Sequence, residues 1–220
     1  KLLDKSQKLI LLGDSLFAEI AYEYFMHDSP YEVVAFAVER EYLSKSSLFG
    51  LPVVSFEEIE TFYRPAEHAF YAALVYTQLN RLRARLYAAA KAKGSTPASY
   101  VSSRAFVWRN VDIGEHSFIF EDNTLQPFVT IGSNVVLWSG NHIGHHSHIR
   151  DHVFISSQVV ISGVCDIGEH WTVGNNVVVG RDCLIGAGAC VIKDVPENTL
   201  VKGVQSEVAG FSARKYFKLE

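Results

Sequence analysis

The chain has 220 residues, of which 48% are hydrophobic, and a formal net charge of −4 at pH 7. This composition suits one large or two small packed domains, and the absence of a Lys/Arg run argues against a nucleic-acid or anionic-membrane partner. No apolar run approaches the roughly twenty residues that span a bilayer, and the first residues lack the pattern of a signal peptide. We therefore expect a cytoplasmic protein.

Residues 1–96 alternate short apolar runs with stretches of helical spacing, which indicates an α/β domain. The predicted strands cover 8–12, 31–38, 53–54 and 70–75. The predicted helices cover 16–26, a short stretch opened by a capping box of Ser55 and Glu58, and 81–93 with Asn80 as its cap. This order predicts a small Rossmann-like domain with a parallel sheet and right-handed crossovers.

Gly13, Asp14 and Ser15 form the turn after the first predicted strand. In a parallel sheet this turn lies at the carboxyl edge, where a phosphorylated ligand meets the N-terminus of a helix, so the geometry predicts a nucleotide there. A single glycine is a weak signal, and Asp14 would repel a pyrophosphate unless a partner neutralised it. An ordinary turn between strand and helix is the alternative.

From residue 101 to residue 191 an aliphatic side chain recurs at every sixth position, sixteen times in register. Neither a helix nor a strand has that period, so the repeat predicts a solenoid of short strands and tight corners over residues 97–220. Glycine often follows the aliphatic residue, as expected where backbones approach closely or φ is positive. The fifth position of each hexad, which includes Cys165 and Cys183, is mostly small or β-branched, so both thiols are expected to be buried and reduced. Residues 97–103 join the two domains, and a strand over 199–204 caps the solenoid.

Five of the nine histidines fall between residues 142 and 152. Their places in the hexad put His142 and His148 on a flat outer face, and His145, His146 and His152 at corners. Gly163 follows His145 by eighteen residues, or three hexads, so if three hexads make one coil, the residue stacked beside this imidazole has no side chain. That predicts a slot next to a base, as an extended thioester arm requires.

The repeat resembles the left-handed β-helix of hexapeptide-repeat acyltransferases, in which three hexapeptides make a coil of about eighteen residues. The segment GHHSHIRDHVFISSQVVISG is similar, without a gap, to a stretch of the family that includes bacillosamine and perosamine N-acetyltransferases and sialic acid O-acetyltransferases. This resemblance implies a homotrimer that uses acetyl-CoA and needs no metal. It also implies transfer of the acetyl group to an amino sugar linked to a nucleotide, for a bacterial surface polysaccharide such as the O-antigen of lipopolysaccharide.

The resemblance also implies roles for single residues. His145 aligns with the catalytic base, and His146 with the acidic residue that orients it, so a carboxylate from elsewhere is expected to take that part. Gly163 and Gly180 are expected to line the acetyl-CoA arm, and Phe154 stands where relatives have a histidine that approaches the cofactor. Two further residues complete the set: Lys193 is a candidate for the CoA phosphates, and Glu39 stands at the end of the second strand, where relatives often have an aspartate at the nucleotide.

Three other functions remain open from the sequence. A sialic acid type O-acetyltransferase differs only in the acceptor, and the acyl group need not be acetyl. Zinc held between subunits, as in the γ-class carbonic anhydrases of similar fold, is a second alternative, although no two histidines here have the spacing of five that those sites use. A noncatalytic scaffold, with histidines that only fill the corners of a trimer, is the third.

Overall fold

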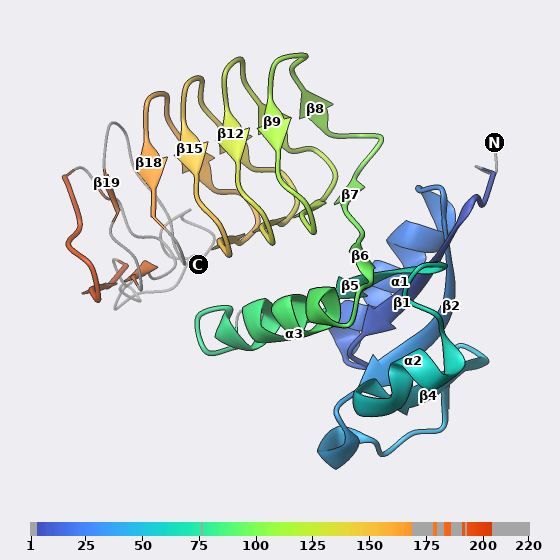
Figure 1. Ribbon diagram of the computed structural model, residues 1–220. Coiled ribbons are helices and arrows are strands. Elements are labelled where there is room, and N and C mark those ends of the chain that lie inside the picture. Colours follow the sequence, from blue (N-terminus) through green and yellow to red (C-terminus); the bar gives the residue numbers. More distant parts are fainter. Residues whose placement is uncertain are drawn as a thin grey trace, which may run out of the picture.

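An N-terminal α/β part is followed by a stack of triangular coils in the computed structural model (Figure 1). The structure describes residues 4–75, 77–168, 178–179, 183–185, 191 and 193–203. The coils form the solenoid that the hexad period predicts, a left-handed parallel β-helix as the resemblance implies. None of the helices in these ranges is both long and apolar enough to span a membrane.

The N-terminal sheet has the strand order β3-β4-β2-β1-β5-β6. Its strands are β1 (Gln7–Leu12), β2 (Tyr31–Val38), β3 (Ser47–Leu48), β4 (Leu51–Ser55), β5 (His68–Ala72) and β6 (Thr96–Pro97). The helices are α1 (Leu16–His27), the 3-10 turns η1 (Arg40–Tyr42) and η2 (Phe56–Glu58), α2 (Ile59–Phe62) and α3 (Arg81–Ala92). The predicted parallel order is confirmed for β1, β2, β4 and β5. Two strands of this sheet were not predicted: β3 pairs antiparallel with β4, and β6 extends the sheet across the predicted domain boundary at residue 96.

The two predicted helix caps are wrong in their hydrogen bonds. Ser55 precedes η2, but its hydroxyl donates to the carboxylate of Glu57 at 2.5 Å instead of capping a backbone N–H. Asn80 precedes α3 with φ of 64°, and its side-chain amide donates to the backbone carbonyl of His152 at 2.7 Å. A tertiary contact with the β-helix has therefore replaced the local cap.

The β-helix is built from two-residue strands that stack on three faces. From β10 to β18 each strand pairs with the one eighteen residues earlier, whereas β19 pairs with β18 at a spacing of twelve residues. The first face contains β7 (Tyr100–Val101), β10 (Phe118–Ile119), β13 (Val136–Leu137) and β16 (Phe154–Ile155). The second contains β8 (Phe106–Val107), β11 (Thr124–Leu125), β14 (His142–Ile143) and β17 (Val160–Ile161). The third contains β9 (Asp112–Ile113), β12 (Thr130–Ile131), β15 (His148–Ile149), β18 (Asp166–Ile167) and β19 (Val178–Val179).

The corners of the coils use a left-handed backbone at the fourth position of each hexad. From residue 116 to residue 164 every sixth residue has positive φ, and Gly140 is the one glycine among them. Of the two reasons predicted for glycine at the second position, positive φ or close approach of backbones, the structure shows the second. A Cβ atom on Gly144, for example, would lie 2.4 Å from the backbone nitrogen of Gly163 in the next coil.

The aliphatic residues of the hexads form the interior of the β-helix. From Ile119 to Ile167 each is at most 1% exposed, whereas Val101 is 39% exposed because no coil lies beneath the first one. Cys165 and Cys183 are buried, as predicted. The predicted terminal strand is confirmed as β21 (Leu200–Val201), which pairs parallel with β20 (Leu184–Ile185).

Aromatic side chains from both parts of the chain form one continuous core between the sheet and the first face of the β-helix. We call this set the interdomain core: Phe17, Tyr24, Phe25 and Tyr71 from the N-terminal part, and Tyr100, Phe118, Phe120 and Trp138 from the β-helix. At its edge the hydroxyl of Tyr24 donates to Glu121 at 2.7 Å.

Helix α3 lies alongside the coils and contacts one corner with each of its turns (Figure 1). Asn80 donates to the carbonyl of His152, the buried Arg83 to the carbonyl of Asn134, and Tyr87 to the carboxylate of Glu115. The rise of about 5.4 Å per helical turn is close to the roughly 4.8 Å between stacked strands, so the two repeats stay in step over three coils.

Candidate active site

His145 and His146 lie at the exposed corner between β14 and β15. Their Nδ1 atoms are 3.1 Å apart and their rings meet edge to face, with centroids at 5.3 Å. One Nδ1 therefore carries a proton and the other accepts it. The structure thus brings His145, the predicted base, into contact with His146, which aligns with the orienting acidic residue of the similar family.

Gly163 lies under the other edge of the His145 ring. A Cβ atom at Gly163 would be 2.7 Å from both Nε2 and Cε1 of His145. The adjacency predicted from the spacing of one coil is therefore present, but the room that the glycine leaves is occupied by the imidazole ring. The two ring nitrogens have different surroundings, because Nδ1 faces His146 and Nε2 lies over glycine backbone.

Two further residues hold this corner, and the sequence did not single them out. The side-chain oxygen of Gln126 accepts the backbone N–H of His145 at 2.9 Å. The ring of Phe128, one coil before His146, stacks on the His146 imidazole with centroids at 4.5 Å and planes inclined by 26°. The His146 ring is thus held by a stacked neighbour although it is exposed to solvent.

The remaining histidines of the cluster are placed elsewhere. His142 and His148 lie on flat faces, as predicted, and His152 occupies a different corner, where its Nδ1 accepts from the amide of Asn134 at 2.8 Å. Within the described ranges no three His, Cys, Asp or Glu side chains are arranged to hold a metal ion. Of the five histidines, only His145 and His146 form a pair, and the other three lie at separate places on the β-helix.

The other residues predicted to contact acetyl-CoA do not lie together at the His145 corner. Phe154 is partly buried on β16 and packs against Trp138 with ring centroids at 6.4 Å, next to the interdomain core. Lys193 is exposed near the end of the β-helix, and Gly180 lies outside the described residues. Contact of these three residues with CoA stays a prediction.

Gly13, Asp14, Ser15 and Glu39 line one cavity of about 240 Å³ at the carboxyl edge of the N-terminal sheet. The rest of its wall is mainly apolar and consists of Leu12, Ala37, Val38, Tyr42, Phe56, Leu74, Leu82 and Leu86. An apolar cavity with a few polar groups at the carboxyl ends of parallel strands is the usual site for a nucleotide in such a sheet. The structure thus places all four predicted substrate-binding residues around a single cavity.

Both acidic residues of this cavity have basic partners. Lys45 lies 3.5 Å from the carboxylate of Asp14 and donates to its backbone carbonyl at 3.0 Å. Arg85 on α3 donates two hydrogen bonds to Glu39, at 2.7 and 2.8 Å, and these hydrogen bonds lower the pKa of the Glu39 carboxyl. Lys45 therefore supplies the neutralising charge that a phosphate beside Asp14 requires.

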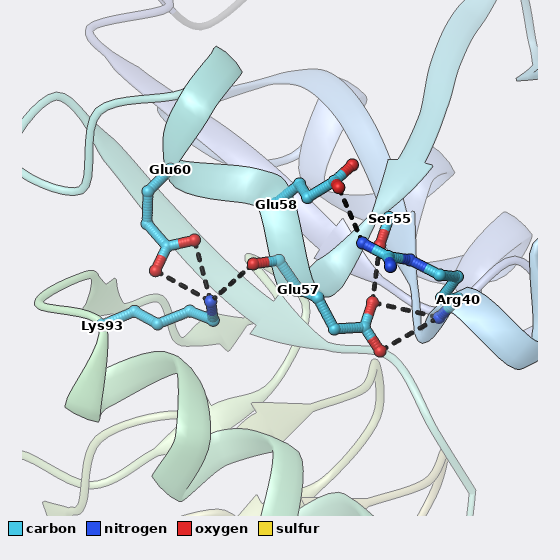
Figure 2. Close-up of polar contacts among 6 residues, drawn as sticks. All are labelled: Arg40, Ser55, Glu57, Glu58, Glu60 and Lys93. Atoms are coloured by element: carbon cyan, nitrogen blue, oxygen red, sulfur yellow. Dashed lines mark hydrogen bonds and ion pairs between the residues drawn. The ribbon is translucent and has the colours of Figure 1, made fainter.

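Figure 2 shows how the segments that follow β2 and β4 are joined beside this cavity. The backbone N–H of Arg40 donates to both carboxylate oxygens of Glu57, at 3.1 and 3.0 Å. Lys93 donates to the backbone carbonyl of Glu57 at 3.2 Å. These contacts fix the neighbouring residues Glu39 and Phe56 as two walls of one cavity.

Three solved structures are similar to nearly the whole chain. A variant of perosamine N-acetyltransferase from Caulobacter crescentus, in complex with CoA and GDP-perosamine, is 19% identical with a TM-score of 0.78 over 93% of this chain and 97% of that one. The acetyltransferase domain of PglB from Neisseria gonorrhoeae is 23% identical with a TM-score of 0.77, over 90% and 97% of the two chains. WeeI from Acinetobacter baumannii is 20% identical with a TM-score of 0.62, over 90% and 97%.

The chain has the fold of these acetyltransferases. No protein-family model matches the sequence, and no curated protein matches it either. The likeness is therefore one of three-dimensional structure across the α/β part and the β-helix together.

Sequence reasoning missed Phe128, Gln126, Lys45 and Arg85. A signal for Phe128 was present, because it precedes His146 by eighteen residues, the same step that connects His145 to Gly163. Lys45 and Arg85 had no such signal, since only the folded loop and helix bring them to Asp14 and Glu39.

Proposed function

We propose that this protein is an acetyl-CoA-dependent acetyltransferase whose acceptor is the amino group of a nucleotide-linked amino sugar. The observation that carries the proposal is the position of His145, whose Nε2 lies over Gly163 at an exposed corner of the β-helix. The shared fold supports it, since one similar structure is an N-acetyltransferase in complex with CoA and GDP-perosamine.

In the proposed reaction the acceptor amine attacks the carbonyl carbon of the thioester, so that a C–N bond forms while Nε2 of His145 takes the amine proton. The C–S bond then breaks, and the leaving thiolate receives that proton to give free CoA and the amide. Acetyl-CoA is already activated, and the described cysteines Cys165 and Cys183 are buried, so the transfer is direct. A neutral amine is a better nucleophile than a hydroxyl, which favours an amino sugar over sialic acid.

The N-terminal cavity is the proposed site for the nucleotide of the activated sugar. Its apolar wall suits a base, and the first turn of α1, which follows Ser15, offers backbone N–H groups to a phosphate. The charge of Lys45 beside Asp14 adds to that attraction. The cavity thus supports a nucleotide sugar as the substrate.

Assembly and setting are further parts of the proposal. We expect a homotrimer in the cytoplasm that makes a precursor of a bacterial surface polysaccharide. Phe128, which is 55% exposed, shares a corner column with His146, and such an exposed apolar group is suited to a subunit contact. Light scattering coupled to size exclusion would give the mass of a trimer, and a monomeric mass would contradict this part.

The function is tested by incubating the protein with acetyl-CoA and a set of acceptors while free thiol is followed. The acceptors are GDP-, UDP- and dTDP-linked 4-amino-6-deoxy sugars, with free sialic acid as the O-acetylation arm. We expect thiol release with one or more amino sugars, and His145→Ala to reduce it about 10²- to 10⁴-fold with CoA binding retained. His148→Ala, which removes an exposed imidazole from the neighbouring strand, is the control.

Each contrary result has a definite meaning. Turnover with sialic acid alone would replace the N-acetyl assignment by the O-acetyl one. Retained turnover in His145→Ala would remove this residue from its role. Activity lost on treatment with a chelator and restored by zinc would favour the metalloenzyme alternative, and failure to bind acetyl-CoA would leave only the scaffold.

A further inference from the structure

We propose that His146 itself is the orienting partner of His145, and that Phe128 is a positioning residue that holds His146 in place. This inference rests on the proposed function. The resemblance led us to expect a carboxylate from elsewhere for the orienting part. The structure assigns it to a second imidazole, the pair being His145 Nδ1–H donating to Nδ1 of His146.

The geometry of the corner fits this direction of the hydrogen bond. The two Nδ1 atoms are 3.1 Å apart, within the normal range for a hydrogen bond. If His145 donates from Nδ1, the lone pair is on its Nε2, the nitrogen that serves as the base in the proposed reaction. The opposite direction would leave a proton on Nε2 and remove the base, because a neutral imidazole has one donor and one acceptor nitrogen.

No carboxylate competes for this position within the described part of the chain. Neither imidazole has a hydrogen bond or ion pair to an acidic side chain there, and the two rings contact each other through Nδ1. The backbone of the two residues bonds to the side-chain oxygen of Gln126, the carbonyl of Pro127 and the N–H of Val164. A neutral His146 can accept one hydrogen bond at Nδ1 as a carboxylate would, without the negative charge. His146 therefore fixes the tautomer of the base and its ring orientation.

Phe128 restricts the motion of the His146 ring, which would otherwise rotate freely at the surface. The His146 ring lies at 4.5 Å from the Phe128 ring in a stacked arrangement, which restricts its rotation about the side-chain bonds. The backbone contributes too, because the N–H of His146 donates to the carbonyl of Pro127 at 3.2 Å. Without the phenyl ring, the His146 imidazole samples other rotamers and the Nδ1 contact is lost for part of the time.

Steady-state kinetics on variants test the pair. We expect His146→Ala to lower kcat about tenfold to a hundredfold with little change in the KM for acetyl-CoA, since it disturbs the base and not the binding of either substrate. His146→Glu should restore most of kcat, because a carboxylate accepts the same Nδ1–H. Phe128→Ala should lower kcat less than His146→Ala, and Phe128→Trp should retain it.

The matched control is Phe106→Ala, which removes a phenylalanine of similar exposure, 52% against 55%, that packs against Trp108 on another face. It should leave kcat unchanged. A purely structural role for Phe128 would lower stability and affect kcat and KM together. No rescue by His146→Glu, or an unchanged kcat in His146→Ala, would overturn the pair.

Neutron diffraction from crystals of the free protein gives a second readout that does not depend on turnover. We expect deuterium on Nδ1 of His145 and none on Nε2 near neutral pH. Deuterium on Nε2 with a bare Nδ1 would reject the inference even if the protein is an acetyltransferase. Conversely, the expected tautomer without turnover on any acceptor would reject the proposed function and keep the pair.

Discussion

Gly163 and His145 lie so close that a single methyl group would displace the imidazole. A Cβ atom at Gly163 would be 2.7 Å from Nε2 of His145, well inside van der Waals contact. The backbone of Gly163 does not require positive φ, so alanine is allowed there by its conformation. A side chain at Gly163 would therefore move the imidazole of His145, the proposed base.

We predict that Gly163→Ala sharply lowers the proposed acetyltransferase activity without unfolding the protein. The His145 side chain is exposed and can rotate away, so the new methyl group moves the base at little cost to stability. Activity should fall by at least about tenfold, with the melting temperature changed by only a few degrees. Thiol release and thermal unfolding measured on the same sample check this.

Gly144→Ala is the matched control for that prediction. Its Cβ atom would lie 2.4 Å from backbone atoms of the next coil, which cannot rotate away. We expect a loss of stability of several kcal/mol in this variant, of the order of other large clashes in a packed core. Equal destabilisation by the two alanines would contradict the distinction between a side-chain and a backbone contact.

A second prediction concerns Lys45 and Asp14 at the N-terminal cavity. Lys45→Ala should weaken binding of a nucleoside diphosphate roughly threefold to tenfold, because Asp14 is then left without its positive partner. Adding Asp14→Asn should restore most of the affinity, since the repulsion disappears with the charge. Calorimetric titration at low and moderate salt measures both effects, and equal losses in the single and double variants would contradict the mechanism.

A third prediction concerns the buried His116. Burial, assisted by the nearby charge of Arg83, holds the pKa of this imidazole well below its ordinary value of 6.5. The unfolded chain therefore takes up a proton below about pH 6.5 that the folded chain does not, and stability falls as the pH is lowered. The expected loss is about 1.4 kcal/mol per pH unit in that range, while above pH 6.5 this contribution is fully present.

Urea unfolding between pH 7.5 and 5 measures that slope. His116→Gln keeps an acceptor for the N–H of Ala72, which donates to His116 at 2.8 Å, but does not titrate. The slope should therefore be smaller in the variant, whatever its stability at pH 7.5. The range stops at pH 5 because carboxylates such as Glu39 and Glu115, whose pKa values are lowered, add their own loss below it.

A fourth prediction uses the left-handed corners. Val164 has φ of 62° and is 60% exposed, and a β-branched residue is strained in that conformation. Val164→Asn should raise the free energy of unfolding by about 0.5–1 kcal/mol, since asparagine tolerates the left-handed region. Val160→Asn is the control, because Val160 is 62% exposed on the extended strand β17 and asparagine there should bring no gain.

The sequence predicted the β-helix well because its cause is local and repeated. Each hexad places an aliphatic residue inside, and the step of eighteen residues places Gly163 beside His145 without further knowledge of the fold. The same step failed to indicate free space, since it says which residues are neighbours but not how a ring is turned. The tautomer and orientation of His145 depend on rotamers that a linear pattern does not contain.

The N-terminal part was predicted in its elements and missed in its long-range contacts. Asn80 has the sequence of a helix cap, but its amide bonds to His152, seventy-two residues away. Competition between a local hydrogen bond and a tertiary one is decided by packing, which propensities do not include. The partners of Asp14 and Glu39 belong to the same class, because Lys45 and Arg85 reach them only in the folded chain.

The N-terminal part and the β-helix depend on each other through the interdomain core. Phe17 and Tyr71 on one side and Phe118 and Trp138 on the other share a single set of ring contacts. Separating the chain at residue 97 would leave both cut surfaces covered with exposed aromatic rings, a condition that leads to aggregation. The protein should therefore unfold in one cooperative step. Neither piece should stay folded and in solution without the other.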